Sequence, residues 1–463
     1  MSKEMEWQDY LKEHRQRFID ELLAFIKIPS ISAQTEYADD VYRAGEWFAQ
    51  RLKAAGLNNV QLMPTGGHPV VYGDWIQSPD LPTILIYGHF DVQPVDPLEL
   101  WKLPPFEASI VNDCIYGRGA SDDKGNLLSP VAAVEALLQT TDQLPVNVKF
   151  FAEGQEEIGS PQLPQFIAEN KELLACDLVV SADGLQWSVD QPSIEVALRG
   201  MIVLEVRVLG PEKDLHSGLY GGMVQNPIHA LAHLVASFHD ENGRVTVAGF
   251  YDDVEELSAM EREQMAKIPF DDQELKERFQ VDSLFGEFGY SSIERIWSRP
   301  TLEICGIAGG YQGEGIKGIV PAEAMIKLTC RLAASQDPQK ITRAIHNHVA
   351  NYTLPGVKIN ILEGEDKGAG AYRMPVDHPG NLAATGILTQ LYGKEPFVTR
   401  SGGSIPICGL FLKELQAYTV GFSFSYEDEN LHSPNEFFRL DSLDKGQKGY
   451  VMLLHELAKT LKK

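Results

Sequence analysis

The stretch TILIYGHFD, residues 83–91, joins a short apolar run to polar residues that can perform chemistry. Its first five residues have the length and the branched and aromatic side chains of a buried strand. Two further runs of this kind follow at residues 147–152 and 177–181. Helical patterns lie between the runs, at residues 127–138 and 163–174. Strands that alternate with helices predict an α/β fold with a mainly parallel sheet.

The hydrophobic pattern changes near residue 196. Residues 196–208 and 324–332 alternate apolar with polar side chains, which is typical of a sheet with one face in water. Helical patterns accompany them at residues 227–238 and 338–349. We therefore predict a smaller α+β domain inserted into the first domain.

The domain boundaries follow from these changes of pattern. The first domain is expected to comprise residues 1–195 and 375–463, and the inserted domain residues 196–374. A chain of 463 residues is long enough for two or three domains.

Composition excludes several classes of partner. The chain has 40 basic and 65 acidic residues, and its formal charge of −25 argues against nucleic acid and anionic membranes as partners. No apolar run approaches the roughly 18 residues of a membrane span. The five cysteines are scattered and form no C-x-x-C pair, which predicts reduced thiols in a cytoplasmic protein.

Polar residues follow each predicted strand of the first domain. Because ligands bind outside the carboxyl ends of strands in open α/β sheets, these side chains are expected to converge. So many carboxylates beside a histidine at one sheet edge would repel one another strongly without a compensating cation. The converging residues are His89, Asp91, Asp122, Glu156, Glu157 and Asp183.

A pair of divalent metal ions satisfies this set. Mixed histidine and carboxylate ligands suit Zn²⁺ or Mn²⁺ better than Ca²⁺. Asp122 is central in the chain order and is a natural bridge between two ions. His89 and Asp183 could complete one site, and Glu157 with a late histidine the other.

Two carboxylates remain for supporting roles. Asp91 lies two residues after His89 and could orient the ring of that ligand. Glu156 is adjacent to a ligand but is not needed as one, so it fits the general base that takes a proton from the attacking water.

These motifs resemble the M20 metallopeptidase family, and most closely its dinuclear dipeptidases of the carnosinase-like group. The resemblance rests on GHFDVQP, YGRGASDDKG, EGQEEIGS, SADG and ENLHSPNE, which span residues 88 to 436. It implies a zinc-exopeptidase-like catalytic domain and an inserted ferredoxin-like lid domain that forms a homodimer. It also implies a cis bond between Asp122 and Asp123.

The resemblance also implies roles for individual residues. The expected metal ligands are His89, Asp122, Glu157, Asp183 and His432, with Glu156 as the base and Asp91 as the orienting acid. His216 of the lid is expected to stabilise the oxyanion in the partner subunit's site. Arg331 is expected to bind the terminal carboxylate of the substrate, and Ser404 to contact the substrate.

The function implied is metal-dependent hydrolysis of the amide bond of dipeptides or other short peptides. The alternative is an N-acyl amino-acid deacylase of the same family, of the desuccinylase or deacetylase type. The segments DLHSGLYGG and GGSIP favour the peptidase. The ligand types leave Zn²⁺ and Mn²⁺ equally open.

Three other patterns are weaker. The segment GEGIKG, residues 313–318, matches a dinucleotide fingerprint, but no helix is predicted after it. His229 and His233 lack the glutamate of a zinc-binding H-E-x-x-H helix. A triad of Ser404, His432 and Asp428 would lack the G-x-S-x-G turn of a serine hydrolase. A non-catalytic acidic binding module would bind metal without hydrolysis.

Overall fold

The computed structural model describes residues 6–352, 354–363, 368, 370–402 and 406–461. The chain divides into two compact units. The first comprises Met1–Val196, Met374–Thr399 and Leu410–Lys463, and the second Ala197–Arg373 and Arg400–Gly409. The second unit therefore includes a short segment, Arg400–Gly409, that the sequence assigned to the first domain.

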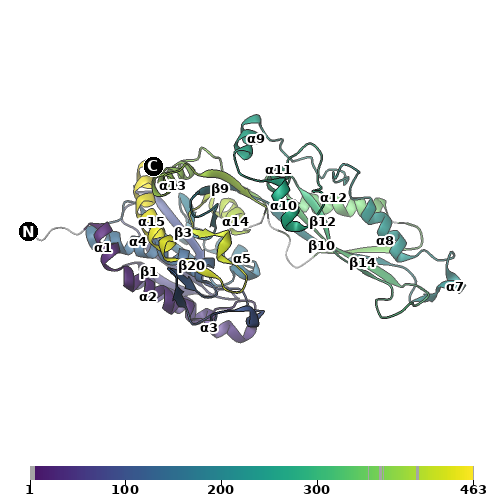
Figure 1. Ribbon diagram of the computed structural model, residues 1–463, viewed down its shortest axis with the longest axis horizontal. Coiled ribbons are helices and arrows are strands. Elements are labelled where there is room, and N and C mark those ends of the chain that lie inside the picture. Colours follow the sequence, from purple (N-terminus) through teal and green to yellow (C-terminus); the bar gives the residue numbers. More distant parts are fainter. Residues whose placement is uncertain (1–5, 353, 364–367, 369, 403–405, 462–463) are drawn as a thin grey trace, which may run out of the picture. The chain divides into compact units, whose positions relative to one another are not determined.

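A six-stranded mixed sheet forms the centre of the first unit (Figure 1). Its strands are, in order, β1 (Asn58–Met63), β2 (Val70–Trp75), β6 (Asn147–Glu153), β3 (Thr83–His89), β7 (Leu178–Ser181) and β18 (Thr419–Gly421). The four strands from β6 to β18 run parallel, which confirms the mainly parallel sheet. Strand β2 pairs antiparallel with both of its neighbours, β6 and the edge strand β1.

Helices cover the parallel strands, which explains their continuous apolar sequences. Gly88 of β3 faces α4 (Asn126–Thr141) so closely that an added Cβ would lie 2.9 Å from Leu127. The preceding residue, Tyr87, points to the opposite face. There its ring makes an edge contact with Phe411 of α14 (Pro406–Leu415), and Phe411 also contacts Phe151 of β6.

The remaining helices of the first unit are α1 (Trp7–Glu13), α2 (Arg15–Ile26), α3 (Ala38–Ala54), α5 (Leu163–Glu169), α6 (Lys171–Leu174), α13 (Pro379–Tyr392) and α15 (Leu440–Thr460). α15 packs on α4 and α13. The helix predicted over residues 163–174 is two helices, α5 and α6. Asn170 lies between them with a non-helical backbone (φ −117°, ψ 26°), and its side-chain amide donates to the carbonyl of Phe166.

The second unit contains a four-stranded antiparallel sheet. Its strands are, in order, β12 (Thr301–Gly309), β14 (Glu323–Leu332), β10 (Gly200–Leu209) and β15 (Lys358–Glu363). The alternating pattern predicted over residues 196–208 is divided between β9 (Ser193–Leu198) and β10, with Arg199 between them.

Helices α8 (Pro227–Ala236) and α12 (Pro338–Asn351) pack along this sheet (Figure 1). The alternation predicted for β14 is confirmed, because every second residue from Ala324 to Leu332 is buried and the residues between them are not. The buried residues are Ala324, Ile326, Leu328, Cys330 and Leu332. An α/β unit interrupted by an α+β unit is the predicted fold class.

Three short helices occupy the polar stretch of the second unit: α9 (Ala259–Ala266), α10 (Asp272–Phe279) and α11 (Ser292–Ser298). A search of the described residues for a helix long and apolar enough to cross a membrane finds none.

We expect Leu328→Ala to lower the free energy of unfolding of the second unit by about 2–5 kcal/mol, because it leaves a cavity in a filled core. Leu328 is fully buried, whereas Leu362 of β15, in the same sheet, is 47% exposed. Leu362→Ala is therefore the matched control and should cost well under half as much. Amide exchange of β14 measured in increasing urea gives both values, and equal losses would contradict the core described for this sheet.

Candidate metal centre

Five predicted ligands come from segments that follow strands or lie between elements of the first unit. His89 ends β3, and Asp183 follows β7. Glu157 lies in a short 3₁₀ helix (Glu156–Ile158) that begins three residues after β6. Asp122 lies in the turn Ala120–Gly125, where its φ of −115° and ψ of 92° interrupt the helical backbone. His432 lies in the segment between Glu429 and β20 (Phe437–Arg439).

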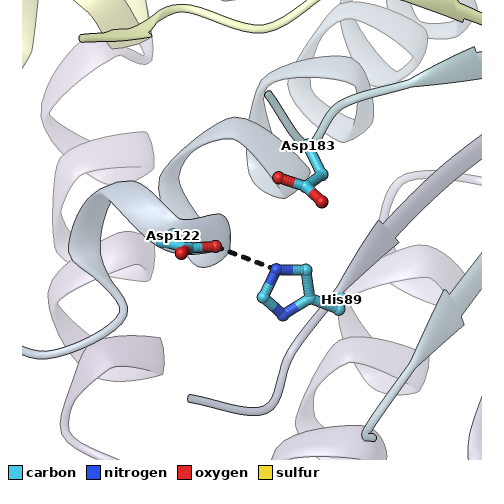
Figure 2. Close-up of side chains that lie close together, drawn as sticks. All are labelled: His89, Asp122 and Asp183. Atoms are coloured by element: carbon cyan, nitrogen blue, oxygen red, sulfur yellow. Dashed lines mark hydrogen bonds and ion pairs between the residues drawn. The ribbon is translucent and has the colours of Figure 1, made fainter. Parts of the chain in front are cut away.

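The carboxylate of Asp122 lies between two histidines. Its Oδ1 is 3.0 Å from Nε2 of His89, and its Oδ2 is 2.9 Å from Nε2 of His432 (Figure 2 shows the His89 side). Nε2 of His432 is also 3.1 Å from Oε2 of Glu157. The peptide bond between Asp122 and Asp123 is cis, as the resemblance implied.

The side chains form two groups of three possible ligands that share Asp122. One group is His89, Asp122 and Asp183, and the other is Asp122, Glu157 and His432. Within each group the possible ligand atoms lie within 4.8 Å of one another. Figure 2 shows Asp183 beside His89 and Asp122 in the first group. A carboxylate whose two oxygens face different groups has the arrangement of a bridging ligand.

Buried negative charge dominates the centre. Burial raises the pKa of Asp183 to about 6 and that of Glu157 to about 7, and it raises the pKa of Glu156 well above its usual value. Burial also opposes ionisation of Asp122, but hydrogen bonds to His432 and His89 hold the pKa of Asp122 below its usual value. Hydrogen bonds to Asp122 and Glu157 raise the pKa of His432 to about 10.

These groups fit a pair of divalent ions. In the described ranges, neither lysine nor arginine forms an ion pair with Asp122, Glu156, Glu157 or Asp183. The carboxylates must therefore hold protons or share cations, because buried like charges cannot all ionise together. Two imidazoles and three carboxylates in overlapping groups offer the oxygen and nitrogen donors that Zn²⁺ and Mn²⁺ accept.

Asp91 contacts both sides of the centre. Nδ1 of His89 lies 3.1 Å from the Asp91 carbonyl oxygen and 3.5 Å from its Oδ1. The carboxylate of Asp91 accepts hydrogen bonds from the backbone N–H groups of Glu156 and Glu157, each at 3.1 Å. Asp91 therefore holds the backbone of these two glutamates as well as facing the His89 ring.

Three predicted site residues are not part of the two ligand groups. His216 is in β11 (Leu215–His216) of the second unit, where its exposed ring accepts a hydrogen bond of 3.0 Å from the N–H of Gly218. Arg331 is in β14 of the same unit, opposite Met201 of β10. Ser404 lies outside the described residues.

The part of the chain that the structure describes does not support the competing patterns. Asp428 accepts a hydrogen bond from Arg439, while His432 faces Asp122, so two members of the proposed serine-hydrolase triad are engaged elsewhere. The glycine segment 313–318 is followed by the short strand β13 (Ile319–Val320). The helical histidines His229 and His233 form neither of the two ligand groups.

Sequence reasoning missed three residues that contact the centre. Asp123 is buried, and its Oδ2 accepts a hydrogen bond from the backbone N–H of His89. Gln93 donates from Nε2 to Oε2 of Glu157 at 2.7 Å. Glu436 accepts a hydrogen bond from the backbone N–H of Asp122. Their only signal was their place inside the motifs DDKG, GHFDVQP and ENLHSPNE.

Known proteins resemble this chain over nearly its whole length. The Cys-Gly metallodipeptidase dug1 of Schizosaccharomyces pombe is 29% identical and covers 97% of both chains. Among solved structures, human carnosine dipeptidase 1 is 27% identical with a TM-score of 0.77, over 98% of both chains. The M20 family metallo-carboxypeptidase Sso-CP2 from Sulfolobus solfataricus is 34% identical with a TM-score of 0.83, over 96% of this chain and 99% of that chain.

A family model gives the same assignment from the sequence. The model described as Peptidase family M20/M25/M40 matches residues 85–456. This span contains the five residues of the two ligand groups. The resemblance inferred from the motifs is thereby confirmed, and the chain belongs to peptidase family M20/M25/M40.

Proposed function

We propose that the chain is a metallodipeptidase that hydrolyses the amide bond of dipeptides and other short peptides, with two divalent ions, Zn²⁺ or Mn²⁺, in each subunit. The observation that carries the proposal is the Asp122 carboxylate, whose oxygens face one ligand group each. Relatives named Cys-Gly metallodipeptidase and Beta-Ala-His dipeptidase support the choice of a dipeptide substrate.

The two ligand groups would hold one ion each, with Asp122 common to both. When bound, such a pair supplies a nucleophilic water at neutral pH and polarises the scissile carbonyl. Gln93 holds one oxygen of Glu157 by its hydrogen bond, and Asp91 fixes the Glu157 backbone. These contacts orient a ligand before it binds an ion.

Glu156 is the general base in this proposal. Its backbone N–H is held by Asp91, and its neighbour Glu157 belongs to a ligand group. Because burial raises the pKa of Glu156, its carboxyl is suited to hold a proton between two steps. Glu156 takes the proton from the attacking water and returns it to the leaving amine.

The second unit supplies the remaining roles. Arg331 binds the C-terminal carboxylate of the peptide, and Ser404 contacts the substrate. His216 donates to the oxyanion in the site of the partner subunit, so the working form is a homodimer. The acidic chain with five scattered cysteines acts in the cytoplasm.

Two other substrate classes compete with dipeptides. The 34% identity to a metallo-carboxypeptidase favours release of a C-terminal residue from longer peptides. An N-acyl amino-acid deacylase uses the same kinds of ligand. All three substrates end in a carboxylate that Arg331 can bind, so the length and the amino end of the substrate decide between them.

Metal-loaded protein is expected to cleave dipeptides faster than tripeptides, longer peptides or N-acyl amino acids. Chelation should abolish this cleavage, and Zn²⁺, Mn²⁺ or Co²⁺ should restore it, because the carboxylate cluster needs cations. A mass-spectrometric screen of mixed substrates measures both effects. Full activity in protein shown to be metal-free would overturn the metal centre, and preferred cleavage of N-acyl amino acids would favour the deacylase.

Glu156→Gln should lower kcat by about 10²–10⁴-fold while metal content stays normal, because glutamine keeps the shape but cannot accept a proton. Glu157→Gln, the neighbouring control, should instead lose metal affinity first, because Glu157 belongs to a ligand group. Elemental analysis and steady-state kinetics separate the two variants. Near-normal turnover by Glu156→Gln would contradict its role as the base.

Mixed dimers of Glu156→Gln and His216→Ala subunits test the shared site. In such a dimer one site takes Glu156 from the second chain and His216 from the first, so it is intact, and the other site lacks both. Random pairing makes half of the dimers mixed, so about a quarter of normal activity should return. If His216 serves its own subunit, every site in the mixture is defective and isolated mixed dimers will show no recovery.

A further inference from the structure

Glu436 is a buried carboxylate that lies behind the proposed metal centre. Its side chain is fully buried, and the residue is four positions after His432 in the same segment. Neither of its oxygens belongs to either ligand group. Its four hydrogen-bond donors all come from residues 118–122, more than 300 positions earlier in the chain.

The two oxygens of Glu436 divide these donors equally. Oε1 accepts from the backbone N–H groups of Ser121, at 2.9 Å, and Asp122, at 3.1 Å. Oε2 accepts from the backbone N–H of Gly119 and from Nη1 of Arg118, both at 2.8 Å. Four convergent donors require an acceptor-only group, which an ionised carboxylate is and an amide is not.

The backbone of the Asp122 turn needs such an acceptor. Gly119 is left-handed, with φ +79°, and Asp122 leaves the helical conformation, so the N–H groups of this turn do not all have helical partners. Glu436 takes three of these N–H groups at once. It therefore fixes the direction in which the Asp122 side chain leaves the backbone.

Arg118 extends the contact to a third segment. The guanidinium is almost fully buried and pairs with Glu436 through Nη1, while Nη2 donates to the carbonyl of Pro94 at 3.1 Å. Pro94 follows the segment that bears His89 and Asp91. The Glu436–Arg118 pair thus connects three segments that carry predicted ligands.

The segment that bears His432 is held at the same point. The backbone N–H of Gly117 donates to the Glu436 carbonyl. The side chain of Asn435 accepts from the Lys102 N–H and donates to the Leu100 carbonyl. His432 itself has left-handed backbone, with φ +59°, and a side chain that is 54% exposed. Its position opposite Asp122 depends on the anchored residues that follow it.

We propose that Glu436 is a positioning residue that preorganises the Asp122 turn and the His432 segment relative to each other before any metal ion binds. Glu436 belongs to neither ligand group, and it acts through the backbone of Asp122. The expected effect of Glu436 on metal affinity rests on the proposed function. The order that Glu436 imposes on the Asp122 turn does not require metal.

The variant Glu436→Gln keeps size and shape but leaves two of the four donors without an acceptor, because an NH₂ group cannot accept. Partners of this kind typically contribute on the order of 10–100-fold to metal affinity. We expect Glu436→Gln to weaken Zn²⁺ or Mn²⁺ binding by that factor, measured by chelator competition. The visible absorption of the Co²⁺-loaded protein should change as well.

Glu135→Gln is the matched control. Glu135 is also a buried carboxylate of the first unit, and it pairs with Arg17 and Arg51. Both variants should lower Tm, but only Glu436→Gln should change metal affinity and the Co²⁺ spectrum. Wild-type affinity in Glu436→Gln, or an equal loss of affinity in both variants, would overturn the proposal.

Amide exchange of the metal-free wild-type protein provides a second measurement that needs no variant. The peptide spanning residues 117–125 should be protected without metal, because Glu436 already holds three of its N–H groups. Fast exchange that slows only when metal is added would overturn the proposal, even if Glu436→Gln fails to fold. A wild-type protein that binds no metal would refute the proposed function, and the exchange experiment would still decide the preorganisation of the turn.

Discussion

The arrangement of the first unit depends on the burial of several carboxylates around Asp122. Each carboxylate alone loses hydration energy when it leaves water, and together they repel. Asp122 remains acidic because two histidines donate to its two oxygens. The neighbouring groups Asp183 and Glu157 instead have raised pKa values. The fold can balance this buried charge with protons or with cations, and the histidine and carboxylate donors present suit divalent cations.

The parallel sheet places these residues at one edge. Strands β3, β6 and β7 are adjacent and parallel, so their carboxyl ends lie side by side, and each is followed by a polar residue of the centre. Both faces of the sheet are covered, so the core needs no contribution from the polar edge. The body of each strand therefore packs in the core, and the end of each strand carries the site residues. In β3 the change occurs between adjacent residues, because Gly88 packs against α4 and His89 faces Asp122.

The sequence predicted the parts of the site that depend on short-range order. The predicted strands indicated that His89, Glu156, Glu157 and Asp183 lie close together, because residues at the carboxyl ends of adjacent parallel strands share one edge of the sheet. His432 was identified only through the family motif, since no periodicity marks its segment. The contacts of Asp91 with two backbone N–H groups and of Glu436 with three were not predicted. The Asp91 contacts join residues 65 and 66 positions apart, and the Glu436 contacts join residues more than 300 positions apart. Local sequence patterns do not encode the turn conformations that bring such residues together.

The histidines of the two ligand groups differ in their exposure to solvent. His89 is fully buried and is held by the backbone of Asp91, whereas the side chain of His432 is 54% exposed. A buried histidine and a solvent-exposed histidine on opposite oxygens of one carboxylate suit a centre that must admit a substrate while its geometry stays fixed. His432 needs anchoring more than His89 does, because it lies in a turn that contains left-handed residues and belongs to neither a helix nor a strand. Glu436 and Asn435 follow His432 within four residues and anchor its segment. Buried Glu436 accepts a hydrogen bond from the Asp122 turn, and Asn435 binds residues 100–102 nearer the surface. The position of the exposed ligand is therefore set by contacts of the residues that follow it.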